Sequence, residues 1–312
     1  MNQPIYIIIN PHSHQGRGWK RWQSIKTDVF TLLPEAKEIV TDKKEDTDAF
    51  FKTLNSTDLE TILISAGGDG SVHHLANAIF RSGRDRSKII LGAIGLGSSN
   101  DFLKPFQKTI NKIPVRIDIK TIPRYQDVGK AVFTDEKNIT REKFFIINSS
   151  FGATAEGNWN FNNPGSLLKW LKKNNTSLAI SYTAITTILG FKNKTCAVSY
   201  NETIKQLPVS NISILKIPFV SGSLHYQQTI LPDDGQLGLN ICADMSKTEL
   251  LQTLFNLEKG KFKVNEKKTS VFIKKFSLQS DDPVVFECDG ETEKIFKADI
   301  SIIPKAIRIL NS

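Results

Sequence analysis

The sequence contains few cysteines and lacks long apolar runs, and each absence excludes a class of protein. Its three cysteines, Cys196, Cys242 and Cys288, are far apart and have no metal-site spacing. This usage argues against a disulfide framework and for a reducing, cytosolic compartment. No stretch reaches the length of a membrane-spanning helix, and residues 1–10 have the pattern of a first strand rather than of a signal peptide. A globular chain of 312 residues remains, long enough for two domains.

Acidic residues are outnumbered, with 32 against 41 basic residues and a formal net charge of +9. This excess favours an anionic partner, such as nucleotide phosphate, an anionic membrane surface or nucleic acid. The excess is spread over both halves of the chain, which argues against a dedicated nucleic-acid surface. We therefore expect no nucleic-acid partner.

A glycine-rich loop follows an apolar run that starts at Ile62. The run suits a buried strand, residues 67–71 read Gly-Gly-Asp-Gly-Ser, and Val72 to Phe80 is predicted to be a helix. A loop that joins a strand to a helix offers free N–H groups and a helix dipole to anions. Glycine lets a phosphate approach closely. The loop lacks the Lys-Ser/Thr ending of a Walker loop and the spacing of a Rossmann fingerprint, and an ordinary glycine-rich turn is the alternative.

Two further polar loops follow apolar strands. Ile5 to Ile9 precedes Asn10-Pro11 and the segment from His12 to Gly18, and Ile89 to Ile94 precedes Gly95 to Phe102. Strands that alternate with helices predict a doubly wound parallel sheet, whose ligands bind beyond the carboxyl ends of the strands. All three loops are expected at that edge.

The pattern changes after Val115 to short alternating strands. One helical segment, from Ser166 to Leu189, interrupts them. We predict an α/β nucleotide-binding domain at residues 1–125 and a β-rich substrate domain at residues 126–312.

Two acidic turns lie in this β-rich half, at Pro232 to Gly235 and at Cys288 to Glu291. Each alone is more often a hairpin turn. Together with the glycine loop and Asn100-Asp101, they supply the parts for phosphoryl transfer, which needs phosphate donors, carboxylates for Mg²⁺ and a carboxylate that orients the attacking hydroxyl.

The order of four motifs resembles the diacylglycerol kinase catalytic-domain family, over nearly the whole chain. The motifs are Gly67-Gly68-Asp69-Gly70-Ser71, Gly97-Ser98-Ser99-Asn100-Asp101-Phe102, Asp234-Gly235 and Asp289-Gly290-Glu291. That family is similar to sphingosine and ceramide kinases and more remotely to NAD kinases. The resemblance implies a nucleotide-binding α/β domain followed by a β-sandwich that binds lipid.

The resemblance also implies roles for individual residues. The catalytic residues would be Asp289 and Glu291 as a general-base pair, with Asp69 supporting metal-bound phosphate. A structural Mg²⁺ would bind Asp234 and the backbone carbonyls of Leu231 and Gln236. The residues implied to bind ATP are Asn10, Pro11, His12, Ser13, His14, Thr41, Gly67, Gly68, Asp69, Gly70, Ser71, Val72, His73, Gly97, Ser98, Asn100 and Asp101.

The sequence departs from the family pattern at two places. His73-His74 stands where the family has Asn-Glu, and Gln228-Thr229-Ile230 replaces the Pro-x-Ala that precedes Asp234. With His12 and His14, the histidines invite a metal-cluster hypothesis, but neither pair has the usual zinc spacing. Polar, solvent-bound histidines are favoured.

No acidic residue occurs between Gly157 and Asn201, where five lysines alternate with aromatic residues; the lysines are 169, 172, 173, 192 and 194. This composition suits either an interface with an anionic surface or a core-packing helix with a solvated basic face.

We therefore predict an ATP- and Mg²⁺-dependent lipid kinase in the cytoplasm, peripherally associated with the inner face of the membrane. Diacylglycerol, converted to phosphatidic acid, is the expected substrate. The alternatives are an NAD kinase-like or sphingoid-lipid kinase, or a degenerate nucleotide-binding regulator. The prediction leaves room for a homodimer.

Overall fold

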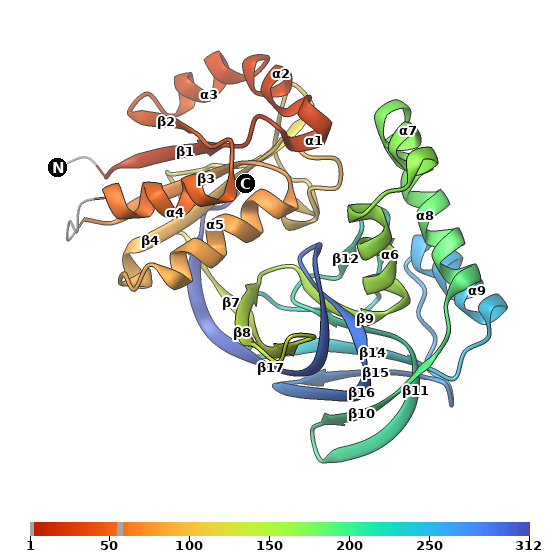
Figure 1. Ribbon diagram of the computed structural model, residues 1–312. Coiled ribbons are helices and arrows are strands. Elements are labelled where there is room, and N and C mark those ends of the chain that lie inside the picture. Colours follow the sequence, from red (N-terminus) through yellow and green to blue (C-terminus); the bar gives the residue numbers. More distant parts are fainter. Residues whose placement is uncertain (1–2, 55–58) are drawn as a thin grey trace. The chain divides into compact units, whose positions relative to one another are not determined.

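The computed structural model describes residues 3–54 and 59–312 (Figure 1). The chain forms two compact units, Met1–Asp127 with Lys305–Ser312, and Val128–Pro304. The predicted boundary at residue 125 lies close to this change of unit. The C-terminal residues, which the sequence placed in the second domain, belong to the first unit, because the end of β17 (Glu291–Ile309) pairs in parallel with β4 (Ile89–Gly95).

The first unit contains a mainly parallel sheet with the order β4-β3-β1-β2. β1 pairs in parallel with β2 and β3, and β3 pairs in parallel with β4. β3 and β4 are almost entirely buried, which explains their continuous apolar sequences. The strands of this unit are β1 (Ile5–Ile9), β2 (Ala36–Val40), β3 (Thr61–Gly67), β4, β5 (Thr109–Ile110) and β6 (Ile113–Arg116).

Helices lie on both sides of this sheet, with α2 and α3 on one side and α4 and α5 on the other (Figure 1). The spacing of Trp22, Ile25, Val29 and Leu32 is that of a single helix, but the structure has two short ones, α2 and α3, which bury Trp22 and Val29. The helices of the unit are α1 (Ser13–Gly16), α2 (Gly18–Gln23), α3 (Lys26–Leu32), α4 (Lys44–Thr53), α5 (Asp69–Arg81) and the 3-10 turns η1 (Arg86–Lys88) and η2 (Asp101–Leu103).

The second unit is built from antiparallel strands in the order β15-β14-β11-β10-β16-β17. β9 pairs with both β11 and β16, and β7 pairs with β8 and β17. The strands are β7 (Arg124–Asp135), β8 (Thr140–Phe145), β9 (Asn148–Gly152), β10 (Lys194–Tyr200), β11 (Thr203–Leu215), β12 (Phe219–Val220), β13 (Leu224–His225), β14 (Leu237–Ala243), β15 (Lys268–Ile273), β16 (Lys275–Cys288) and β17. Phe151, Phe276 and Phe286 stack inside this unit, in a core to which most of its strands contribute.

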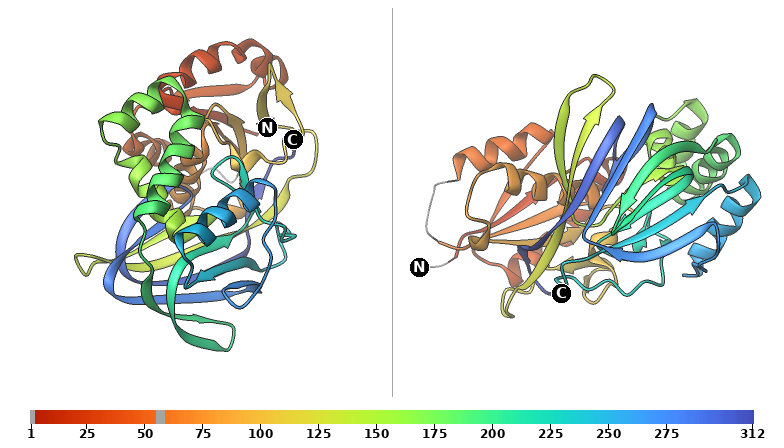
Figure 2. Two further views of the ribbon diagram at one scale, coloured as in Figure 1. Left: turned by 90° about the vertical axis from the view of Figure 1, so that its right-hand side faces the viewer. Right: turned by 90° about the horizontal axis from the view of Figure 1, so that it is seen from below.

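Four helices gather on one side of the strands of the second unit (Figure 2, right). They are α6 (Ala153–Asn162), α7 (Ser166–Asn174), α8 (Thr176–Gly190) and α9 (Lys247–Glu258). The single helix predicted from Ser166 to Leu189 is divided at Asn175, whose side chain accepts the Leu178 N–H at 3.0 Å and caps α8. The sequence analysis missed α6 and α9.

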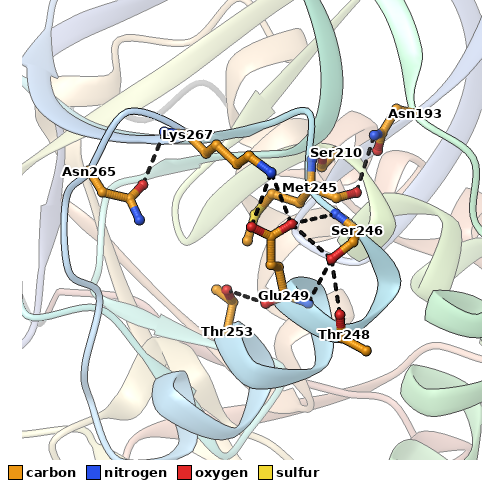
Figure 3. A network of polar contacts seen from close by, with 9 residues as sticks. All are labelled: Asn193, Ser210, Met245, Ser246, Thr248, Glu249, Thr253, Asn265 and Lys267. Carbon is orange, nitrogen blue, oxygen red and sulfur yellow. Dashed lines mark hydrogen bonds and ion pairs between the residues drawn. The ribbon is translucent and has the colours of Figure 1, made fainter.

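A capping box starts α9 (Figure 3). Ser246 Oγ accepts the Glu249 N–H at 3.3 Å, and the Glu249 carboxylate accepts the Ser246 N–H at 2.7 Å. Lys267 Nζ contacts both Glu249 oxygens, at 3.0 and 3.1 Å, and ties the loop before β15 to the helix start. These hydrogen bonds, led by those from Ser246, lower the pKa of Glu249 to about 2.

Candidate functional site

Two glycine loops meet at the carboxyl ends of β3 and β4 in the first unit. β3 ends at Gly67, and α5 begins at Asp69, earlier than the predicted Val72. A Cβ on Gly97 would lie 2.5 Å from the Gly68 Cα, closer than real Cβ contacts come. The Leu96 and Gly97 N–H groups donate to the Gly67 carbonyl at 2.7 and 3.1 Å. Only glycine therefore lets the two backbones pack together beside the amino end of α5.

Asn100 and Asp69 hold the two loops in this arrangement. Asn100 has a left-handed backbone (φ 52°), and its side-chain oxygen accepts the Gly97 N–H at 3.1 Å. Its amide donates to the carbonyls of Gly95 and Gly97. Asp69 Oδ1 accepts the Phe102 N–H at 3.0 Å. The polar residues that the sequence singled out thus build the loops before any ligand is bound.

The first loop lies at the same sheet edge. Asn10 Nδ2 donates to Ser71 Oγ at 3.1 Å, which joins the loop after β1 to the start of α5. Thr41 donates to the Ile9 carbonyl through both its N–H and its hydroxyl. The structure therefore brings Asn10, Thr41 and the glycine loop together.

Three buried polar atoms in and beside this first loop have no hydrogen-bond partner within the described part of the chain. They are Ser13 Oγ, His14 Nδ1 and Arg21 Nε. Arg21 also donates to the Gly95 carbonyl at 3.1 Å, and burial lowers the pKa of its guanidinium. Buried polar groups are nearly always paired, so these atoms fit a polar ligand such as a nucleotide. Sequence reasoning missed Arg21, because a single arginine in a helix carries no signal.

Other predicted nucleotide contacts differ in exposure. The side chains of Val72 and His73 are buried, and His73 packs against His74 and Asn77. Asp101 is buried and pairs with Lys104 at 2.6 Å. Those predicted residues that are at least partly exposed are Asn10, Pro11, His12, Ser13, His14, Gly68, Asp69, Gly70, Ser71 and Ser98.

A cavity of about 1140 Å³ lies elsewhere in the first unit. Its lining includes Tyr6, Thr61 and Ile89, at the amino ends of β1, β3 and β4. It is thus not part of the loop edge.

The acidic turn of the second unit is anchored by Asp289. Its carboxylate accepts the N–H groups of Ile146, Ile147 and Asn148 at 2.9 to 3.0 Å, and its backbone is left-handed (φ 47°). Both oxygens of this buried side chain therefore serve main-chain donors. Glu291, at the start of β17, is partly exposed.

Glu287 is a second buried carboxyl beside this turn, and the sequence analysis missed it. It accepts the Ser150 hydroxyl at 2.6 Å and the Gly290 N–H. Burial raises the pKa of Glu287 to about 7, although these hydrogen bonds act in the opposite direction. The only sequence signal was a charged residue that follows the apolar run Val284 to Phe286.

The predicted metal ligands of the second unit converge, but on a lysine. Lys216 Nζ lies 2.7 Å from the Leu231 carbonyl, 3.2 Å from Asp234 Oδ1 and 3.0 Å from the Gln236 carbonyl. The predicted Mg²⁺ at Leu231, Asp234 and Gln236 does not fit this arrangement, because the ammonium group already lies among the three oxygens. The sequence could not predict this lysine, because the family motif covers the loop around Asp234, whereas Lys216 directly follows strand β11.

The buried Glu287 predicts a pH-dependent stability. A folded-state pKa near 7, above the ordinary value of 4.5, means that the folded chain binds the proton more tightly. The stabilisation is complete below pH 4.5 and is lost as the pH rises towards 7. Between pH 5 and pH 8 the free energy of unfolding of Glu287→Gln, which stays neutral, should fall by about 2–3 kcal/mol less than that of wild type.

Urea unfolding at both pH values, followed by circular dichroism, measures this difference. The exposed Glu266 in the same unit supplies the control, Glu266→Gln, which should follow the wild type. Equal losses for wild type and Glu287→Gln would contradict the prediction.

Among the described residues, no helix is both long and apolar enough to cross a membrane. Both units resemble domains of known protein families. Residues 4–131 match the model of the diacylglycerol kinase catalytic domain, and residues 166–311 match that of the YegS C-terminal NAD kinase beta sandwich-like domain.

Individual relatives agree with these matches. The Schizosaccharomyces pombe protein "Sphingoid long chain base kinase 4" is 29% identical over 109 residues, which are 35% of this chain and 20% of that protein, so the chain matches about a fifth of this relative. A crystal structure of a diacylglycerol kinase from Bacillus anthracis str. Sterne has a TM-score of 0.68 at 14% identity, and covers 99% of this chain and 97% of that one. Yeast NADH kinase complexed with NADH has a TM-score of 0.50 at 8% identity, and covers 99% and 83%. The fold is thus shared with these kinases, and the two domain matches, which together span most of the chain, show that it belongs to the diacylglycerol kinase catalytic-domain family.

Proposed function

We propose that this protein is an ATP-dependent lipid kinase that phosphorylates the hydroxyl of a membrane lipid, diacylglycerol being the foremost candidate. The observation that carries the proposal is the pair of glycine loops at the β3 and β4 ends, with Gly68 and Gly97 in backbone contact. Beside them, buried polar atoms of Ser13, His14 and Arg21 have no hydrogen-bond partner among the described residues. A family match over both units supports the assignment.

The first unit would bind the nucleotide. The amino end of α5 and the glycine loops would receive the phosphates, because N–H groups and the helix dipole favour anions there. Arg21 would add a positive charge beside Gly95. Mg²⁺, bound with ATP, would neutralise phosphate charge, and the Asp69 carboxylate, which is held at the start of α5 by the Phe102 N–H, would help to hold it there.

The second unit would supply the proton acceptor. A lipid hydroxyl must lose its proton as the phosphoryl group is transferred, and a carboxylate can accept it. Asp289 already accepts three main-chain N–H groups, so we assign it the role of an anchor. Glu291, held next to that anchor by the turn, takes the role of base.

The alternatives to this proposal differ in the molecule that would accept the phosphate. An NAD kinase-like activity is suggested by the fold shared with yeast NADH kinase, and a sphingoid substrate by the curated relative. A nucleotide-binding regulator would transfer phosphate to none of these acceptors.

Asp69→Asn tests the proposed activity. Asparagine keeps an acceptor for the Phe102 N–H, so the fold should persist, but the carboxylate is lost and turnover should fall roughly 10²-fold or more. The assay is ADP release from ATP and Mg²⁺ with mixed micelles of diacylglycerol, of a sphingoid base, or with NAD.

We expect ADP release that depends on lipid. The exposed Asp28 in the same unit supplies the control, Asp28→Asn, which should match wild type. Release that requires NAD, or that no acceptor stimulates, would overturn the proposal.

The two acidic positions of the turn should respond differently to amide substitution. Glu291→Gln should lower turnover roughly 10²-fold with a smaller change in melting temperature than Asp289→Asn, because the amide keeps the size of the side chain but cannot accept the proton. Asp289→Asn should lower the melting temperature, because an amide replaces an oxygen that accepts buried N–H groups. Glu293→Gln, two residues further along β17, is the control for kinetics. Loss of turnover in Asp289→Asn alone, at unchanged stability, would reverse the assignment.

Helix α8 supports peripheral membrane association. Leu178, Tyr182, Ile185 and Leu189 recur on one face and are exposed, with fractions of 57, 38, 38 and 51%. The buried residues of the helix are mostly small or hydroxyl-bearing, namely Ala179, Thr183 and Thr187, together with Ile188. In an amphipathic helix of a soluble protein most of the large apolar residues face the core, whereas here four of them are exposed. Exposed apolar residues in such a row indicate an interaction surface.

Helix α7 adds aromatic and basic residues beside this face. Trp170 is 61% exposed, and Lys169 and Lys173 are exposed. Lys172 instead donates to the Phe161 carbonyl at 2.9 Å and lies over the Phe161 ring. The combination fits an anionic bilayer, where basic residues attract lipid headgroups and apolar ones insert.

Variants of these two helices test the membrane surface by vesicle co-sedimentation. Replacing Tyr182 and Ile185 by Ser should reduce binding to every vesicle. Lys169→Gln with Lys173→Gln should weaken binding to anionic vesicles by roughly 30-fold, at about 1 kcal/mol for each charge. Ile204→Ser, at an 80% exposed position on β11, is the control. Wild-type binding by both variants, or an equal loss with Ile204→Ser, would exclude this surface.

A further inference from the structure

We infer that the Lys216 ammonium is the resident cation of the second unit, so that this unit needs no structural divalent metal. The inference is independent of the proposed activity, because it concerns how the partly buried Asp234 carboxylate is neutralised. It reverses the expectation that Asp234 anchors Mg²⁺.

The geometry around Nζ is that of a filled site. An ammonium group has three N–H donors, and three oxygens lie at hydrogen-bond distance, from Leu231, Asp234 and Gln236, at 2.7 to 3.2 Å. These oxygens come from one loop, whereas Lys216 follows β11. Asp234 Oδ1 also accepts the Gln236 N–H at 3.1 Å, which shapes the loop around the cation.

The position of Lys216 is fixed by its own backbone and by burial. Its N–H donates to the Ile147 carbonyl at 2.9 Å, and its side chain is 0% exposed. Long charged side chains are rarely buried unless they are paired. Here each of the three N–H donors has an acceptor, which stabilises the side chain in its buried position.

A divalent ion would not coexist with this ammonium. Mg²⁺ binds oxygen at about 2.0–2.1 Å and Ca²⁺ at about 2.3–2.6 Å, so either would have to take the place of Nζ. Asp234 is the only carboxylate among the three oxygen donors, and one lysine neutralises it. A second cation in the same cage would place an uncompensated positive charge beside the buried ammonium, which is costly.

The first test needs only the wild-type protein without nucleotide. Its melting temperature should be the same in EDTA and in millimolar Mg²⁺ or Ca²⁺. A rise of several degrees with metal, absent from Asp234→Asn, would overturn the inference.

The second test removes the ammonium. Lys216→Ala should lower the melting temperature by on the order of 10 °C, because the partly buried Asp234 carboxylate loses its partner and the space of the buried lysine is left empty. It should also make stability metal-dependent, since the vacated cage of oxygens suits a hard cation. Lys216→Met, neutral but of similar length, should lose stability and gain no metal response, because its side chain still fills the cage.

Matched controls complete the design. Lys297→Ala, which removes the exposed ion pair with Asp299, should change neither stability nor metal response. A Lys216→Ala variant as stable as wild type without metal would overturn the inference, because it would show that the cage does not need a cation. If Lys216→Ala does not fold under any condition, the wild-type metal titration decides.

Discussion

The Asp289 carboxylate holds the acidic turn of the second unit in place, and the chemistry proposed for that unit depends on it. Three main-chain N–H groups of residues 146–148 point at its two oxygens, which fixes the link between β8 and β9 against the turn between β16 and β17. A buried carboxylate with this many donors is costly to remove and adds rigidity. Glu287 and Glu291 are thereby held on either side of a turn that is rigid before any substrate arrives.

The same device recurs in the rest of the molecule, where polar groups are satisfied by the protein's own main chain instead of by a ligand. Lys216 is neutralised by Asp234 and two carbonyls, and Asn100 holds the Gly97 loop through three main-chain contacts. Among the described residues, five buried polar atoms have no partner, and three of them, in Ser13, His14 and Arg21, lie in or beside the first loop. A site that is rigid except for a few unsatisfied groups is preorganised for its ligand, which is how binding energy is kept for catalysis.

Features that depend on local backbone demands could be predicted from the sequence, whereas features that depend on distant partners could not. The glycine loops at Gly67 and Gly97 and the turn at Asp289 were visible because their conformations restrict the residue type. Glu287 accepts a hydrogen bond from Ser150, and Lys216 contacts Asp234 in a loop that follows two further short strands. Because these partners are not sequence neighbours, no local sequence pattern indicates either contact. Helix α9 was missed although its Ser246-x-x-Glu249 capping box is a local signal. The Asn175 cap that divides α7 from α8 was hidden inside one continuous periodic segment.

Transfer of a radiolabelled γ-phosphate from ATP to a total lipid extract, followed by thin-layer separation of the organic phase, tests the central claim most directly. The account predicts one labelled lipid, which migrates with phosphatidic acid when diacylglycerol is the acceptor, and label lower by roughly 10²-fold or more when Asp69 is replaced by Asn. Label that stays in the aqueous phase as inorganic phosphate or as a phosphorylated dinucleotide would contradict it.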